Sequence, residues 1–137
     1  MIPVQAGDHL AFPGWMDTEI AAPEWARFFD SFSRQHEGWL VTVQEMPGVS
    51  SLAHVEVEDL PLQGFSTDEH SRTISIAMGR TPEQHLTHTI AHPRRVFVER
   101  SYEGIDQGVR IEDQDGAATR VTFRTTMRPE EVDGLPV

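Results

Sequence analysis

Three closely spaced histidines are the residues of this chain whose types and positions best suit chemistry. His85, His88 and His92 lie in one short segment, and histidine is both a common metal ligand and a general base near neutral pH. Residues three apart on a strand point to opposite faces, so His85 and His88 do not converge. His88 and His92 share a face but lie about 13 Å apart on an extended strand. The spacing therefore predicts no metal site.

His88 is the candidate catalytic residue. On a strand expected over residues 84–90, it shares a face with Leu86 and Ile90, which we expect to point into the core. A histidine between two buried aliphatic side chains is either a hydrogen-bonded structural residue or part of a pocket. We favour the structural role. The alternative is a small hydrolase or isomerase that uses His88 with an acidic partner in a pocket between sheet and helix.

The run from Arg94 to Tyr102 interleaves basic and aromatic residues. Such side chains stack on nucleobases or hold phosphates, so Arg95, Phe97 and Tyr102 are candidate ligand-binding residues for a nucleotide or RNA. On a strand over residues 95–100, Arg95, Phe97 and Glu99 point outward together. This patch carries its own counter-charge, and local ion pairing is the interpretation we favour.

The composition limits the partners of the protein. The 137 residues include 22 acidic and 11 basic side chains, which give a net charge of −11. Such a charge repels nucleic-acid phosphates and anionic lipids, so we expect neither DNA nor a membrane as partner. The length predicts one domain with a core of its own.

The chain contains no cysteine, which excludes disulfides, thiolate zinc sites and cysteine nucleophiles. No apolar run approaches ~20 residues, and the first residues lack the basic flank and apolar core of a signal peptide. A phosphate-binding glycine loop and a nucleophile elbow are also missing. We expect a cytoplasmic protein without a cofactor.

One segment has a clear helical period. Four large rings recur at i, i+3, i+4 and i+7 and therefore share one face of a helix over residues 23–39: Trp25, Phe28, Phe29 and Phe32. Pro23 suits the first helical position, and Gly38 suits the left-handed conformation that ends a helix.

The rest of the chain alternates between apolar and polar residues, which is typical of antiparallel strands with one wet face. Short strands are predicted over residues 39–45, 52–59, 73–78, 84–90, 95–100, 109–112 and 119–125. An apolar crossing is expected at 59–65 and a polar turn at 66–72. Asp115-Gly116 indicates a hairpin between the last two strands.

These elements predict an α+β fold: one N-terminal amphipathic aromatic helix packed on a curved, mostly antiparallel sheet or small open barrel of about seven strands. Residues 1–22 are expected to form an extended lead-in arm, 23–128 a single domain and 129–137 a loose C-terminal tail. We expect the apolar cluster of the arm, Phe12–Met16, to pack on the domain surface; the alternative is docking on a second subunit or a partner.

Several short motifs resemble a family of small bacterial proteins of unknown function, DUF5335. The resemblance covers roughly residues 22–130 and rests on the helix face with Asp30 and Gly38, on Leu60-Pro61-Leu62 with Gly64, on His88-Thr89-Ile90 with Pro93 and Val96, and on Asp115-Gly116 with Met127 and Pro129. It implies a single-domain cytoplasmic protein and brings no activity and no catalytic residue.

The preferred function is therefore a non-enzymatic binding or assembly module that presents a curved sheet. An open sheet leaves a strand edge that a second copy can cover, so we also expect self-association.

Overall fold

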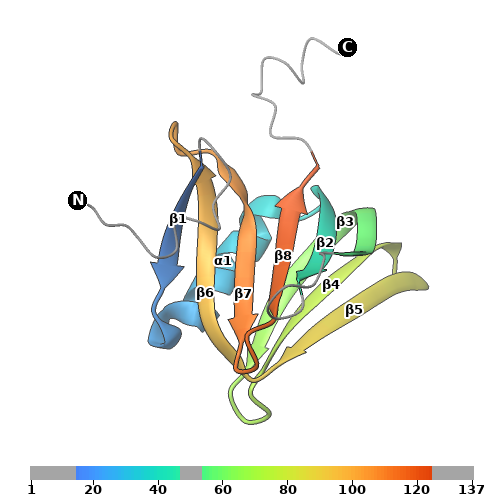
Figure 1. The fold of residues 1–137 in the computed structure, drawn as a ribbon. Helices are drawn as coiled ribbons and strands as arrows, with labels where there is room; N and C mark the ends of the chain where they lie inside the picture. The colour runs from blue at the N-terminus through green and yellow to red at the C-terminus, as the bar shows by residue number, and fades with distance from the viewer. Residues whose placement is uncertain (1–14, 47–53, 125–137) are drawn as a thin grey trace.

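The computed structural model describes residues 15–46 and 54–124 (Figure 1). The remaining residues, which include most of the predicted arm and the predicted tail, lie outside this description. The described elements are β1 (Trp15–Ile20), the 3-10 turn η2 (Ala22–Glu24), α1 (Trp25–His36), β2 (Leu40–Met46), β3 (His54–Asp68), β4 (Thr73–Thr81), β5 (Gln84–Ala91), β6 (Pro93–Ser101), β7 (Asp106–Asp113) and β8 (Ala118–Phe123).

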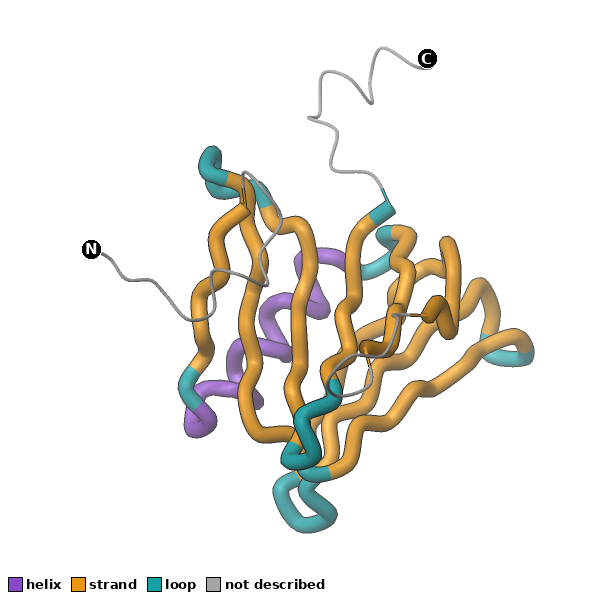
Figure 2. Tube along the Cα trace, in the orientation of Figure 1, coloured by secondary structure: helices purple, strands orange, loops and turns teal. Residues whose placement is uncertain are grey.

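The strands form one antiparallel sheet in the order β1-β6-β7-β8-β2-β3-β4-β5. The sheet curves but does not close into a barrel, so β1 and β5 are its two edges. Figure 2 shows α1 running across one face of the sheet. The predicted α+β fold, with an aromatic helix on a curved antiparallel sheet, is confirmed.

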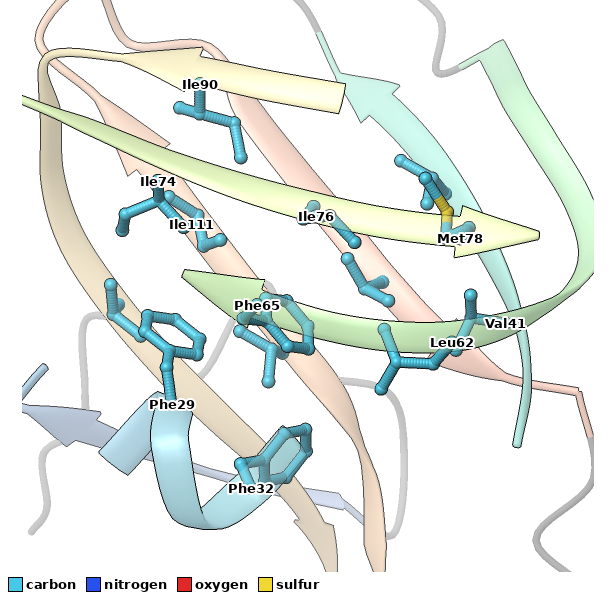
Figure 3. Close-up of a cluster of buried hydrophobic side chains, with 14 of the residues drawn as sticks. Phe29, Phe32, Val41, Leu62, Phe65, Ile74, Ile76, Met78, Ile90 and Ile111 are labelled. Carbon is cyan, nitrogen blue, oxygen red and sulfur yellow. The ribbon is translucent and has the colours of Figure 1, made fainter. Parts of the chain in front are cut away.

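The aromatic face of α1 supplies a large part of the core. Phe29 and Phe32 are buried, whereas Trp25 and Phe28 are partly buried against the same cluster. The Phe29 ring stacks on Phe65 of β3 at 4.9 Å between centroids, and Phe32 stacks on Phe123 of β8 at 5.9 Å. Figure 3 shows both rings of α1 pointing toward the side chains of the sheet. The helix therefore joins two distant strands.

The ends of the helix differ slightly from the prediction. Pro23 lies in the 3-10 turn Ala22–Glu24 that precedes α1 rather than in α1 itself. At the other end Gly38 has φ +90°, and its N–H donates to the carbonyl oxygen of Leu62 at 2.8 Å. The glycine thus ends the helix as predicted and also connects it to β3.

The 15-residue strand β3 makes the sheet curve. Its first half pairs with β2, and its second half pairs with β4. The partner changes between Pro61 and Leu62, shortly after Asp59, a non-glycine residue with φ +59° that lies at a register shift in the pairing with β2. The predicted crossing over residues 59–65 is therefore wrong, because one left-handed residue bends the strand without ending it. Beyond the bend, β3 pairs with β4, whose Ile74, Ile76 and Met78 point toward the rest of the core (Figure 3).

Two edge strands also differ from expectation. Residues 15–20, which the sequence places in the lead-in arm, pair with β6 from Trp15↔Ser101 to Ile20↔Val96. On β5, Ile90 is buried as expected, but Leu86 is 52% exposed. Its pairing partner on β4, Met78, is buried, so alternation alone does not set the exposure of a side chain on this edge strand.

We predict that Phe32→Ala lowers the free energy of unfolding by about 3–5 kcal/mol, because the ring is buried between α1, β3 and β8. Phe28→Ala removes a partly buried ring from the same helix and serves as the control, with a smaller loss. Urea unfolding measures both values. A midpoint for Phe32→Ala within error of the wild type would contradict the packing described here.

Candidate functional site

The predicted basic and aromatic patch does not come together as one surface. Phe97 is 4% exposed, and Glu99 is fully buried, although both lie on the face of the sheet opposite to α1. The guanidinium carbon of Arg95 lies 4.9 Å from the Phe97 centroid, and that of Arg110 lies 4.3 Å away. Tyr102 is 69% exposed on the turn after β6. Phe97 therefore lies on the outward face, as alternation predicts, but its ring is covered and contacts two arginines.

Phe97 borders a cluster of buried charged side chains that sequence analysis missed. The members are Asp17, Glu99, Arg110 and Arg120, one from each of β1, β6, β7 and β8, and we call them the buried charge cluster. Arg110 Nη1 lies 2.7 Å from Asp17 Oδ2 and 3.0 Å from Glu99 Oε2. Arg120 Nη2 lies 2.9 Å from the same Glu99 oxygen. The cluster therefore ties four strands together.

Burial dominates the electrostatics of Glu99. Desolvation raises the pKa of Glu99 above its usual value, and the negative charge of Asp17 raises it further, against the lowering effect of Arg120 and Arg110. Within the described residues, Asp17 Oδ1, Glu99 Oε1 and Arg110 Nη2 have no hydrogen-bond partner. A buried acid with a raised pKa suits acid–base catalysis. Neither of the two cavities described below reaches it, however, so we interpret the cluster as a structural ion-pair network.

A second buried polar contact joins the end of α1 to β7. His36 Nε2 lies 3.1 Å from Asp106 Oδ2, and Arg100 Nε donates to Asp106 Oδ1 at 2.7 Å. The His36 ring also stacks on Phe123 at 4.7 Å. Burial raises the pKa of Asp106, but hydrogen bonds from His36 and Arg100, together with the charge of Arg100, lower it more, so its pKa falls below the usual value. The i+4 spacing from Phe32 is the sequence signal that places His36 on the buried face.

The histidines of the predicted chemical segment separate in the structure. His88 Nε2 lies 3.5 Å from Glu45 Oε2 across the sheet, and the His88 side chain is 18% exposed. His85 is exposed, with Nδ1 2.9 Å from the carbonyl oxygen of Pro82. His92 lies in the link between β5 and β6. In the part of the chain that the structure describes, no group of three or more metal-binding side chains lies close enough to hold an ion.

Strand β5 is an edge of unusual composition for this acidic protein. Its sequence, Gln-His-Leu-Thr-His-Thr-Ile-Ala, contains no acidic or basic residue other than histidine and no proline. Among the described residues it pairs only with β4, and Gln84–Thr87 are all exposed. The opposite edge, β1, carries Asp17 and Glu19. Natural sheets commonly protect their edges with charges or proline, and β5 has neither.

Two cavities lie at the two ends of α1. One, of about 540 Å³, is bordered by the start of the helix, the β3–β4 turn and the β5–β6 link. The other, of about 680 Å³, is more open and lies between Gly38, the middle of β3 and the β4–β5 turn. His88 lines neither of them. Among the described residues, His88 therefore has an acidic partner but borders neither of these two cavities.

We predict that Arg110→Met lowers the free energy of unfolding by about 3–5 kcal/mol, because it leaves the buried carboxylates of Asp17 and Glu99 without their shared cation. Arg27→Met removes an exposed helix ion pair with Glu24 and should change stability by no more than about 0.5 kcal/mol. Equal losses in the two variants, measured by urea unfolding, would refute this assignment.

We also predict a pH-dependent role for Asp106. Since folding lowers its pKa below 3.8, Asp106 contributes stability above that value, and the contribution disappears as the pH falls through the folded pKa. The stability difference between wild type and Asp106→Asn should therefore be largest above about pH 5 and shrink toward pH 3. Asp115→Asn, on the exposed β7–β8 turn, is the control. A difference that stays constant over this range would exclude the ion pair.

No helix among the described residues is long and apolar enough to cross a membrane.

A model of a known protein family matches the chain over most of the fold. The model of the family of unknown function DUF5335 matches residues 16–132, a span that includes nearly all of β1 and every later described element. Comparisons with curated proteins and with solved structures gave no match. Because the family model covers well over half of the chain, from β1 through β8, the chain belongs to the DUF5335 family of unknown function.

Proposed function

We propose that this protein is a non-enzymatic assembly module that binds a second copy of itself through β5. The observation that carries the proposal is the uncharged, exposed edge strand described above. Alternate N–H and C=O groups of an edge strand point away from the sheet and are able to pair with another chain. Main-chain pairing supplies the contacts, and the side chains decide which strand is accepted.

The charge of the protein favours this strand as the contact. Two copies that each carry −11 repel one another, and the repulsion is smallest where no carboxylate lies at the interface. Edge β1 would instead bring the exposed Glu19 of both copies together, whereas its Asp17 is buried against Arg110. The difference between the two edges therefore supports β5 over β1.

The sequence of β5 also suits pairing with itself. A two-fold axis perpendicular to the sheet keeps inward-facing residues of both copies on one face, so an antiparallel register centred on His88 is allowed. This register places Leu86 opposite Ile90 of the second copy, and it removes from water the exposed Leu86 side chain. Because a single strand pair buries a small area, we expect a dissociation constant on the order of 10 µM.

Light scattering after gel filtration tests the proposal over a range of protein concentrations. The mass should rise from 15.5 kDa toward twice that value, and higher salt should strengthen the association because it screens the repulsion between the copies. Several hundred micromolar is far above the expected dissociation constant. A mass of 15.5 kDa at that protein concentration in high salt would therefore overturn the proposal.

Two matched lysine substitutions test the location of the contact. Leu86→Lys places a charge on the β5 edge and should abolish the dimer. Tyr102→Lys changes another exposed apolar residue, on the turn after β6, and should leave the dimer intact. Either lysine lowers the net negative charge and so favours association in general. Loss of the dimer in Leu86→Lys alone therefore supports β5, and an intact dimer in that variant counts against it.

The His88–Glu45 pair supports a second candidate function, a small hydrolase or isomerase. Its weakness is the missing cavity at His88 in the described residues. The test is turnover of ester or carbonyl substrates by the wild type and by His88→Gln. If His88→Gln abolishes this turnover and keeps the thermal midpoint of the wild type, this function takes first place.

A further inference from the structure

We propose that the cavity at the start of α1 binds a small carboxylic acid with a flat, apolar body. The cavity measures about 540 Å³, within the range of small-molecule sites in proteins. None of its lining residues belongs to β5, so the proposal does not depend on self-association. Four segments that are distant in sequence form its walls: the start of the helix, the β3–β4 turn, the β5–β6 link and Gln114 of the β7–β8 turn.

The helix supplies the apolar wall. Ala22, Pro23, Trp25 and Ala26 line the cavity, and none of them carries a charge. The indole N–H of Trp25 donates to the carbonyl oxygen of Ile20 at 2.8 Å, which fixes the orientation of the ring. A fixed, partly buried indole offers a flat apolar surface on which a planar group of a ligand is able to stack.

Two of the other three segments supply cations without a protein partner. Arg72 and Arg94 line the cavity and are exposed, and within the described residues neither guanidinium group has an ion pair or a hydrogen bond. Most other described arginines are paired with a carboxylate: Arg27, Arg34, Arg95, Arg100, Arg110, Arg120 and Arg124. In a chain with twice as many acidic as basic residues, two unpaired arginines at one cavity favour an anionic ligand.

The acidic residues of the cavity narrow the choice of anion. Asp68 Oδ1 accepts the backbone N–H groups of His70 at 2.9 Å and Ser71 at 3.2 Å, so this carboxylate is engaged in its own turn. Glu69 also lines the cavity. Both negative charges repel a doubly charged phosphate more strongly than a singly charged carboxylate, while the guanidinium fork fits either anion. The combination therefore favours a carboxylate.

The backbone at the rim is held in an unusual conformation. Arg72 has φ +58° and His92 has φ +54°, two of the three non-glycine residues with positive φ in the described chain. The His92 N–H donates to the carbonyl oxygen of Arg72 at 2.9 Å, and the His92 carbonyl accepts from Gln114 N–H at 3.1 Å. Glycine would adopt these angles without strain. Such strained positions gather at ligand sites, and here they hold the two arginine-bearing segments together.

Two-dimensional NMR of the full chain with 3-phenylpropionate as the probe tests the site. We expect saturable shifts of the Trp25 indole N–H signal, identified by its loss in Trp25→Phe, with a dissociation constant on the order of 1 mM. The matching alcohol, 3-phenylpropanol, and inorganic phosphate should each bind at least about tenfold more weakly. An absence of saturable shifts, or phosphate binding as tight as that of the probe, would overturn the proposal.

Three arginine variants locate the contact. Arg94→Gln and Arg72→Gly should each weaken 3-phenylpropionate binding at least about tenfold. Arg72→Gly relieves the positive φ, so its thermal midpoint should not fall, which separates loss of binding from loss of folding. Arg80→Gln is the matched control, because Arg80 is an exposed arginine that lines only the other cavity. Unchanged binding in Arg94→Gln, or equal weakening in Arg80→Gln, would overturn the site.

Discussion

The burial of the aromatic face of α1 is the interaction on which the rest of the structure depends. Four rings on one helix expose too much apolar surface for a flat sheet to cover, and the sheet must curve around them. The long strand β3 contributes to that curvature, because it pairs with β2 up to Pro61 and with β4 from Leu62 onward, next to the left-handed residue Asp59. Phe65 and Phe123 then reach the helix from strands that are not neighbours in the sheet.

Local patterns predicted the elements but not their ends or their neighbours. The helix face, the alternating strands and the hairpin at Asp115-Gly116 each depend on a few adjacent residues, and all are present. The sequence analysis missed the continuous β3 because Asp59 and Pro61 look like a break. In the structure Asp59 adopts the left-handed conformation without ending the strand. Pro61 is opposite Leu40 of β2, in a pairing that needs no N–H from the proline. Strand β1 was missed because only six residues alternate before the helix begins.

The candidate sites were harder to predict for a different reason. Alternation placed Phe97 and Glu99 opposite to the core correctly, but it carries no information about which strands flank β6. Only the strand order reveals that Asp17 and Arg110 lie beside Glu99 and that these charges are buried together. The cavity at α1 likewise depends on three turns that meet in space. Its only signal in the sequence is that Arg72 and Arg94 lie next to turns. Arginines beside turns are too common for this signal to be specific.

The pairing of β1 with β6 has a consequence for how the chain folds. Asp17 and Arg110 are 93 positions apart in the sequence. Strand β1 therefore cannot form its contacts until β6 and β7 have been synthesised. A contact between such distant positions carries a large loop-closure entropy, and sheets built this way fold slowly. The helix next to β1 can form early on local interactions. The strand itself is expected to join late, and it will be the first part of the sheet to leave when the native state opens.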